Sequence, residues 1–208
     1  MVVCQVEASE TMSSELKTNK VSPATGTALQ IGDSGDTITI PSGATLTNSG
    51  SATGFGKVLQ VVSSTYRTVE STTNVGSFVA SGLTATITPT SSSSKILVNM
   101  NCQISTSDTN PANLAIYRNG SVATDLIGTG ATSSRSNSTT NTILPLAYSM
   151  SNSPFTGMDE PSTTSATTYT VYWASYSGTT VMNRPHANND AFYNAFVPST
   201  LTLMEIAG

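Results

Sequence analysis

The chain has 208 residues, only 10% of them charged, and its formal net charge is −4. Its eight Lys and Arg residues are scattered, which argues against a nucleic-acid surface, and no apolar run is long enough to span a membrane as a helix. About a third of the residues are Ser or Thr. Because β-branched residues are abundant and charge is scarce, the composition favours strands over a disordered chain.

Residues 1–30 predict an N-terminal arm. Charged residues are closely spaced here, with Glu7, Glu10, Glu15, Lys17 and Lys20 lying near one another in the sequence. Two alternatives fit the pattern, a short helix around Glu7–Leu16 or an extended, solvated arm. The ends of a chain are seldom ordered unless another surface holds them. We therefore expect residues 1–30 to dock against a partner or a neighbouring copy.

Residues 31–56 predict a short shaft and a hinge. Turn sequences recur every seven or eight residues, at Asp33-Ser34-Gly35, Pro41-Ser42-Gly43 and Asn48-Ser49-Gly50. The glycines and the proline exclude a helix. A single chain gains too little from burying such isolated aliphatic residues to offset the entropy of ordering the segment. We therefore expect identical chains to share a thin apolar axis, made by Ile31, Ile38, Ile40 and Leu46.

Residues 57–208 predict an antiparallel β-sandwich or jelly roll, so the expected fold class is all-β. The clearest alternation of apolar and polar residues is in Lys95–Ser105, and Asn119-Gly120 is a strong hairpin turn. Long loops are expected at 128–141, 151–165 and 184–190. Further strands are expected at 58–62, 83–89, 114–118, 142–150 (interrupted by Pro145), 166–176, 192–197 and 201–206.

Two residues carry alternative interpretations. Alternation places Tyr169, Val171 and Trp173 on one face of a strand and Tyr172 on the other. Trp173 is interpreted as a core or interface residue in preference to a sugar-stacking one. Cys102 is expected to pack as a small apolar side chain, and a disulfide with Cys4 is the less favoured alternative.

The segment KTNKVSPATGTALQIGDSGDTITIPSGATLTNSGSATGFGKVLQVV, Lys17–Val62, resembles tail-fibre-like structural proteins of marine bacteriophages, including those that infect cyanobacteria. The block IGDSGDTITIPSGAT is the specific part of this resemblance. The ending STLTLMEIAG is similar to the close of the same proteins. Between these segments the strand pattern is similar to the trimeric jelly roll of C1q and tumour necrosis factor. The resemblance implies a virion component, usually a homotrimer.

The expected function is that of a homotrimeric virion fibre on the tail or another surface appendage. Residues 1–30 would join other virion proteins, residues 31–56 would hold three copies together, and residues 57–208 would present loops to a host-surface glycan or protein. The alternative is a capsid decoration protein, head fibre or structural adaptor without a receptor role. The residues expected to face a receptor are Arg184, His186, Asn188, Asn189, Asp190, Asp159 and Glu160.

The chain is not expected to be an enzyme or to hold a cofactor or metal, because no GxSxG or HExxH motif is present. His186 and Asp190 share one loop, which is interpreted as a polar surface in preference to an acid–base pair. The adjacent Asp159 and Glu160 would point in opposite directions on a strand, so they are not expected to form a catalytic pair; a partner from elsewhere, such as Glu70 or Asp125, is the open alternative. Asp33 and Asp36 are interpreted as turn caps in preference to calcium ligands, since an EF-hand needs more oxygens.

Overall fold

The computed structural model describes residues 20–45, 47, 49, 58–133, 135–144, 149–192 and 194–208. The chain divides into two compact units, Met1–Thr53 and Gly54–Gly208, which are taken separately below. The alternative helix at Glu7–Leu16, the axis residue Leu46 and the hinge residues 51–56 lie outside the described residues.

The described part of the first unit contains two of the three predicted turns, and the third, at Asn48-Ser49-Gly50, falls partly outside the described residues. In one, the N–H of Asp36 donates to the carbonyl of Asp33 at 3.1 Å, while the carboxylate of Asp36 accepts from the N–H of Asp33 at 2.8 Å. Gly35 has a φ of +99° there, which glycine adopts without steric cost. The other turn closes through Ala44, whose N–H donates to the carbonyl of Pro41 at 3.0 Å. These bonds agree with the interpretation of the two acids as turn residues.

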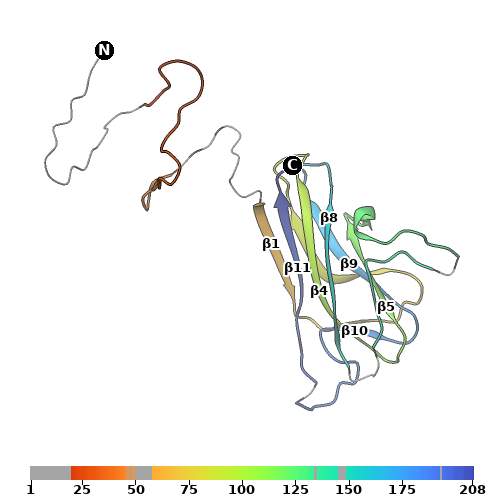
Figure 1. The fold of residues 1–208 in the computed structure, drawn as a ribbon. Helices are drawn as coiled ribbons and strands as arrows, with labels where there is room; N and C mark the ends of the chain where they lie inside the picture. Colours follow the sequence, from red (N-terminus) through yellow and green to blue (C-terminus); the bar gives the residue numbers. More distant parts are fainter. Residues whose placement is uncertain are drawn as a thin grey trace. The chain divides into compact units, whose positions relative to one another are not determined.

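The second unit is built from two antiparallel sheets (Figure 1). The first sheet has the order β1-β11-β4-β10-β2, with β8 also paired to β4, and the second has the order β3-β9-β5-β6, with β7 also paired to β5. The strands are β1 Val58–Tyr66, β2 Glu70–Thr72, β3 Val79–Ile87, β4 Lys95–Thr106, β5 Ala112–Arg118, β6 Ser121–Val122, β7 Thr140–Thr142, β8 Ser151–Asp159, β9 Thr167–Ser175, β10 Thr180–Met182 and β11 Ser199–Ile206; a 3-10 turn, η1, spans Thr124–Leu126.

The strand order is that of a jelly roll. The first sheet contains the run β1-β11-β4-β8, and the second contains β3-β9-β5 with β7 on the far side of β5. The chain therefore changes sheet on entering β3, β4, β5, β8, β9 and β10, which produces two Greek keys. Strands β11 and β10 both pair with β4, in adjoining stretches of that strand. The predicted all-β sandwich is confirmed.

The core lies between the two sheets and follows the predicted alternation. Every second residue of β4 from Ile96 to Ile104 is fully buried, as is Trp173 of β9, so the core interpretation of the tryptophan is confirmed. Cys102 is free and buried in the same cluster. Burial raises the pKa of its thiol to about 12, which makes this sulfur a packing group and a poor nucleophile.

One predicted loop is a strand. Residues 151–165 were expected to be a loop, but Ser151–Asp159 forms β8 and pairs with β4 along its whole length. The residues that alternate inward include Ser153 and Gly157, so no apolar periodicity marks this strand in the sequence. Its hydrogen bonds come from β4, and Pro154 is accepted because β8 has β4 as its partner on one side only.

Two predicted strands are shorter or absent. Instead of a strand over 142–150, the described residues contain β7 at Thr140–Thr142, and residues 145–148 lie outside them. The strand expected at 192–197 is not formed by its described residues. There the N–H of Asn194 donates to the carbonyl of Ala191 at 2.9 Å, so the backbone turns and does not pair with a neighbouring strand.

The sandwich has two ends, which the strand register defines. At the first, Val58 of β1 pairs with Ile206 of β11, and Ile206 pairs with Lys95 of β4. The preceding segment joins the sandwich at Val58, so we call this the entry end. At the opposite end Tyr66 pairs with Ser199, and we call it the far end.

Glu205 is a fully buried carboxylate near the entry end. Its Oε2 accepts a hydrogen bond from Gln60 Nε2 at 2.6 Å, and its Oε1 accepts from the N–H and the hydroxyl of Thr90, both at 2.7 Å. Burial alone would raise the pKa of Glu205, but the hydrogen bonds outweigh it and lower the pKa to about 2. The ionised carboxylate thus ties β1 and the loop before β4 to the last strand.

Glu205→Gln is expected to lower the free energy of unfolding at neutral pH by about 1–3 kcal/mol, because the replacement amide cannot accept all of these bonds. The folded-state pKa of Glu205 lies below its ordinary value of about 4.3, so its contribution is fully present above that value and is lost as the pH falls toward about 2. Urea unfolding of both proteins across this pH range measures the difference. Glu160→Gln, at an exposed carboxylate, is the control; a difference that stays constant with pH would contradict the prediction.

Candidate functional site

The far end carries the loop that joins β10 to β11, residues 183–198, which we call the far loop. In Figure 1 it is the blue loop at the bottom of the sandwich, at the opposite end from the C-terminus. It contains most of the residues that the sequence predicts to face a receptor. Its geometry therefore decides which of their side chains are accessible.

Asn183 closes the base of the far loop. Its side chain is fully buried, and its Nδ2 donates to the carbonyls of Tyr66 and Thr68 at 2.9 and 2.8 Å. Its Oδ1 accepts from the hydroxyl of Ser199 at 2.7 Å, and its carbonyl accepts from the N–H of Val197 at 3.1 Å. A φ of +69° suits asparagine better than most residues. The two ends of the loop are therefore held together on the sandwich.

Arg184 bonds to its own loop. Its Nη1 donates to the carbonyls of Pro185 and His186 at 2.7 and 3.0 Å, and its own carbonyl accepts from the hydroxyl of Ser105 at 2.8 Å. Its side chain, like that of His186, is half-buried. The guanidinium thus supports the loop backbone that leads to the exposed tip.

The tip of the far loop is exposed and combines amides with aromatic rings. Asn188, Asn189 and Asp190 are exposed, as predicted, and line a hollow of about 260 Å³ together with Phe196. Phe192 is fully exposed and Phe196 is mostly so. Sequence reasoning missed the two phenylalanines because it assigned them to a strand; the Asn194 between them was the available turn signal.

A neighbouring loop at the far end carries a fixed negative charge. The carboxylate of Asp108 accepts from the hydroxyl of Ser177 at 2.8 Å and from the N–H of Asn110 at 2.9 Å. These bonds hold the pKa of Asp108 below its ordinary value. The loops that follow β4 and β9 are thereby joined beside the far loop.

Asp159 and Glu160 lie at the entry end instead, since Asp159 pairs with Ile96 of β4. Asp159 is fully buried: its Oδ2 accepts from Arg118 Nη1 at 2.7 Å and from the Tyr169 hydroxyl at 2.5 Å. Burial and this carboxylate raise the pKa of Tyr169. The expectation that Asp159 faces a receptor is therefore corrected, because its carboxylate has no exposed surface.

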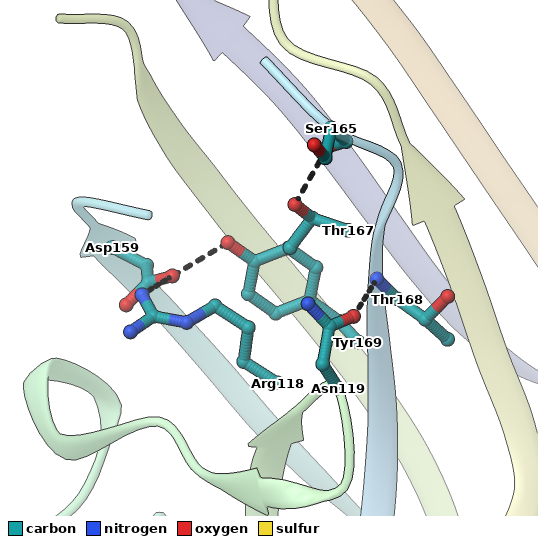
Figure 2. Close-up of polar contacts among 7 residues, drawn as sticks. All are labelled: Arg118, Asn119, Asp159, Ser165, Thr167, Thr168 and Tyr169. Carbon is teal, nitrogen blue, oxygen red and sulfur yellow. Dashed lines mark hydrogen bonds and ion pairs between the residues drawn. The ribbon is translucent and has the colours of Figure 1, made fainter. Parts of the chain in front are cut away.

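Glu160 is exposed and forms an ion pair with Lys95 at 2.6 Å. Next to the buried ion pair, the N–H of Thr168 donates to Asn119 Oδ1 at 2.8 Å, which holds the β5–β6 turn against β9 (Figure 2). The predicted receptor-facing residues therefore form two groups at opposite ends of the sandwich. Only the group at 184–190 belongs to the far loop.

The far loop presents groups that suit contact with another molecule. Exposed amides donate and accept hydrogen bonds, and exposed rings supply stacking surface. Within the described ranges, no group of three or more His, Cys, Asp or Glu side chains is arranged to hold a metal ion. No helix among those residues is both long and apolar enough to cross a membrane. No protein-family model matches the chain, and no curated protein matches it either.

Asn183→Asp is expected to destabilise the far loop. The change replaces Nδ2, which donates hydrogen bonds to two backbone carbonyls, by a carboxylate oxygen that the carbonyls repel. The free energy of unfolding should fall by about 2–3 kcal/mol, as for a buried polar group that loses its partners. Urea unfolding measures this loss. Hydrogen exchange at the Val197 amide should also become faster. Asn188→Asp makes the same change at the exposed tip and should alter neither quantity. Equal behaviour of the two variants would argue against the role of Asn183 in closing the base of the loop.

Proposed function

We propose that the chain is a homotrimeric virion fibre protein whose N-terminal arm joins the particle and whose sandwich adheres to a host surface through the far loop. The observation that carries this proposal is that the two ends of the sandwich differ. The preceding segment enters at Val58, and the exposed amides and aromatic rings lie at the opposite end. A head tethered through its N-terminal side presents such a loop outermost.

The exposed aliphatic residues of the first unit support self-association. In the single chain Ile31, Ile38 and Ile40 are 66%, 61% and 50% exposed. Side chains of this size bury well only against another surface, and each contributes about 1.5–3 kcal/mol when fully buried. In a symmetric trimer the same residue of each chain lies at the same level along the axis. The exposed isoleucines of three chains could therefore meet one another there.

A second apolar surface lies on the outer face of the first sheet. Val61, Met204, Leu97 and Met158 are register partners in turn, so they form one row across β1, β11, β4 and β8. Val61 and Met158 are exposed and the two central residues are half-buried. The adjoining row is polar, with the Ser63 hydroxyl bonded to that of Thr202. In the proposed homotrimer, this apolar row would be covered by the neighbouring copies of the sandwich.

The mechanism we propose is avidity. A contact made by a few amides and rings is weak by itself, but three far loops on one fibre act together. The low charge of the chain limits non-specific attraction and leaves selectivity to the loop.

Ile38→Asp is expected to weaken or abolish the trimer, because equivalent carboxylates would meet on the axis. Met158→Asp is expected to do the same at the sheet face. Sedimentation of the full-length protein measures the oligomer, with Thr39→Asp and Thr156→Asp as neighbouring controls of equal charge. If the Ile38→Asp protein still sediments as a trimer, the shared axis is wrong. If the Met158→Asp protein does so, the contact through the sheet face is wrong.

Replacing Phe192 and Phe196 together by Ser is expected to abolish adhesion of the labelled full-length protein to host cells while the trimer persists. Electron microscopy of virions labelled with an antibody to the chain tests location in parallel. Label on a tail appendage together with loss of adhesion supports the proposal. Label on the capsid with unchanged adhesion favours a decoration protein or adaptor.

A further inference from the structure

A second hollow lies near the far end, separate from the far loop. The described residues 128–133 and 135–138 belong to a projecting hairpin beside the second sheet (Figure 1), and a hollow of about 610 Å³ lies between this hairpin, the start of β5 and the residues that follow β9. We call it the hairpin hollow. Its volume is in the range of sites that hold small molecules. The argument depends on six of its lining residues: Asn113, Thr132, Ser133, Arg135, Ser136 and Tyr176.

The walls of the hairpin hollow are held by hydrogen bonds. The N–H of Thr139 donates to the carbonyl of Leu114 at 2.7 Å, and its hydroxyl oxygen accepts from the N–H of Ile116 at 3.0 Å, which anchors the hairpin to β5. At the tip, Thr132 and Arg135 exchange two backbone hydrogen bonds of 3.2 Å. The first set of bonds ties the base of the hairpin to β5, and the second closes its tip upon itself.

Several polar groups of the hollow have no partner in the part of the chain that the structure describes. Asn113 Oδ1 accepts from Asn141 Nδ2 at 2.6 Å, which orients the amide and leaves Asn113 Nδ2 as an available donor. The hydroxyls of Thr132, Ser133 and Ser136 make no hydrogen bond there. A ligand rich in hydroxyl groups would satisfy such a set of donors and acceptors.

One ring and one positive charge complete the lining. Tyr176 is 62% exposed, so its ring offers a face for stacking. Arg135 is exposed, and its guanidinium forms no ion pair or hydrogen bond with the described residues. None of the described residues that line the hollow carries a carboxylate. An anionic group is therefore favoured, and a guanidinium binds a carboxylate through two parallel hydrogen bonds.

We propose that the hairpin hollow binds an acidic saccharide, with its carboxylate on Arg135, a sugar ring on Tyr176 and hydroxyl groups on Asn113 and the hairpin. This inference does not depend on the chain being a virion fibre. A nucleic acid is a poorer fit, because a single cation lines the hollow and phosphate chains require several. An apolar ligand would leave the hydroxyls and the amide unpaired.

The test uses full-length protein and trimers of galacturonate, glucuronate and mannuronate, each with its neutral methyl ester, in calorimetric and NMR titrations. At least one acid trimer should bind about tenfold more tightly than its ester. Arg135→Gln should remove that preference, and Tyr176→Leu should weaken the acid and the ester alike. Arg67→Gln is the matched control, because Arg67 is exposed at the far end but does not line the hollow.

Phe192→Leu separates this site from the far loop and should leave saccharide binding unchanged. Failure of every acid trimer to bind the wild-type protein would overturn the proposal. So would equal losses in Arg135→Gln and Arg67→Gln, which would indicate attraction by overall charge. Loss in Phe192→Leu with full binding in Arg135→Gln would assign the saccharide to the far loop instead.

Discussion

The register of β4 is the constraint on which the rest of the sandwich depends. This strand pairs with β8 along one edge and with β11 and β10 along the other, so its register fixes both halves of the first sheet. A slip of one residue would move Asn99 and Asn101 into the core and the apolar residues outward. The positions of the entry end and the far end, and hence of every surface discussed above, follow from this register.

Buried polar groups attach the loops to that frame. Glu205 and Asp159 act near the entry end, and Asn183 acts at the far end; each is fully buried and bonded to a loop or a neighbouring strand. An unpaired buried polar group is costly, so these residues disfavour alternative loop arrangements. This is why a chain with few charges can hold long loops in defined positions.

The two ends of the sandwich suit different tasks. The entry end continues into the rest of the chain and carries two ion pairs among its described residues, whereas the far end carries exposed amides, hydroxyls and rings. Binding residues on loops benefit from a rigid scaffold, because less entropy is lost when a ligand orders them. The far loop and the hairpin hollow are both attached to the rigid sandwich, and the hollows at these two places share no lining residue.

The sequence by itself determined the all-β class, the central strands and the main core residues, because alternation with period two is a local property of a half-buried strand. It also identified the Asn119-Gly120 turn, where both residues have positive φ. Only the tertiary structure decided that Ser151–Asp159 is a strand, since its hydrogen bonds come from β4 and, apart from Phe155, its inward side chains are small or polar. Only the tertiary structure separated Asp159 from Asp190, because strand order determines the end of the sandwich at which each residue lies.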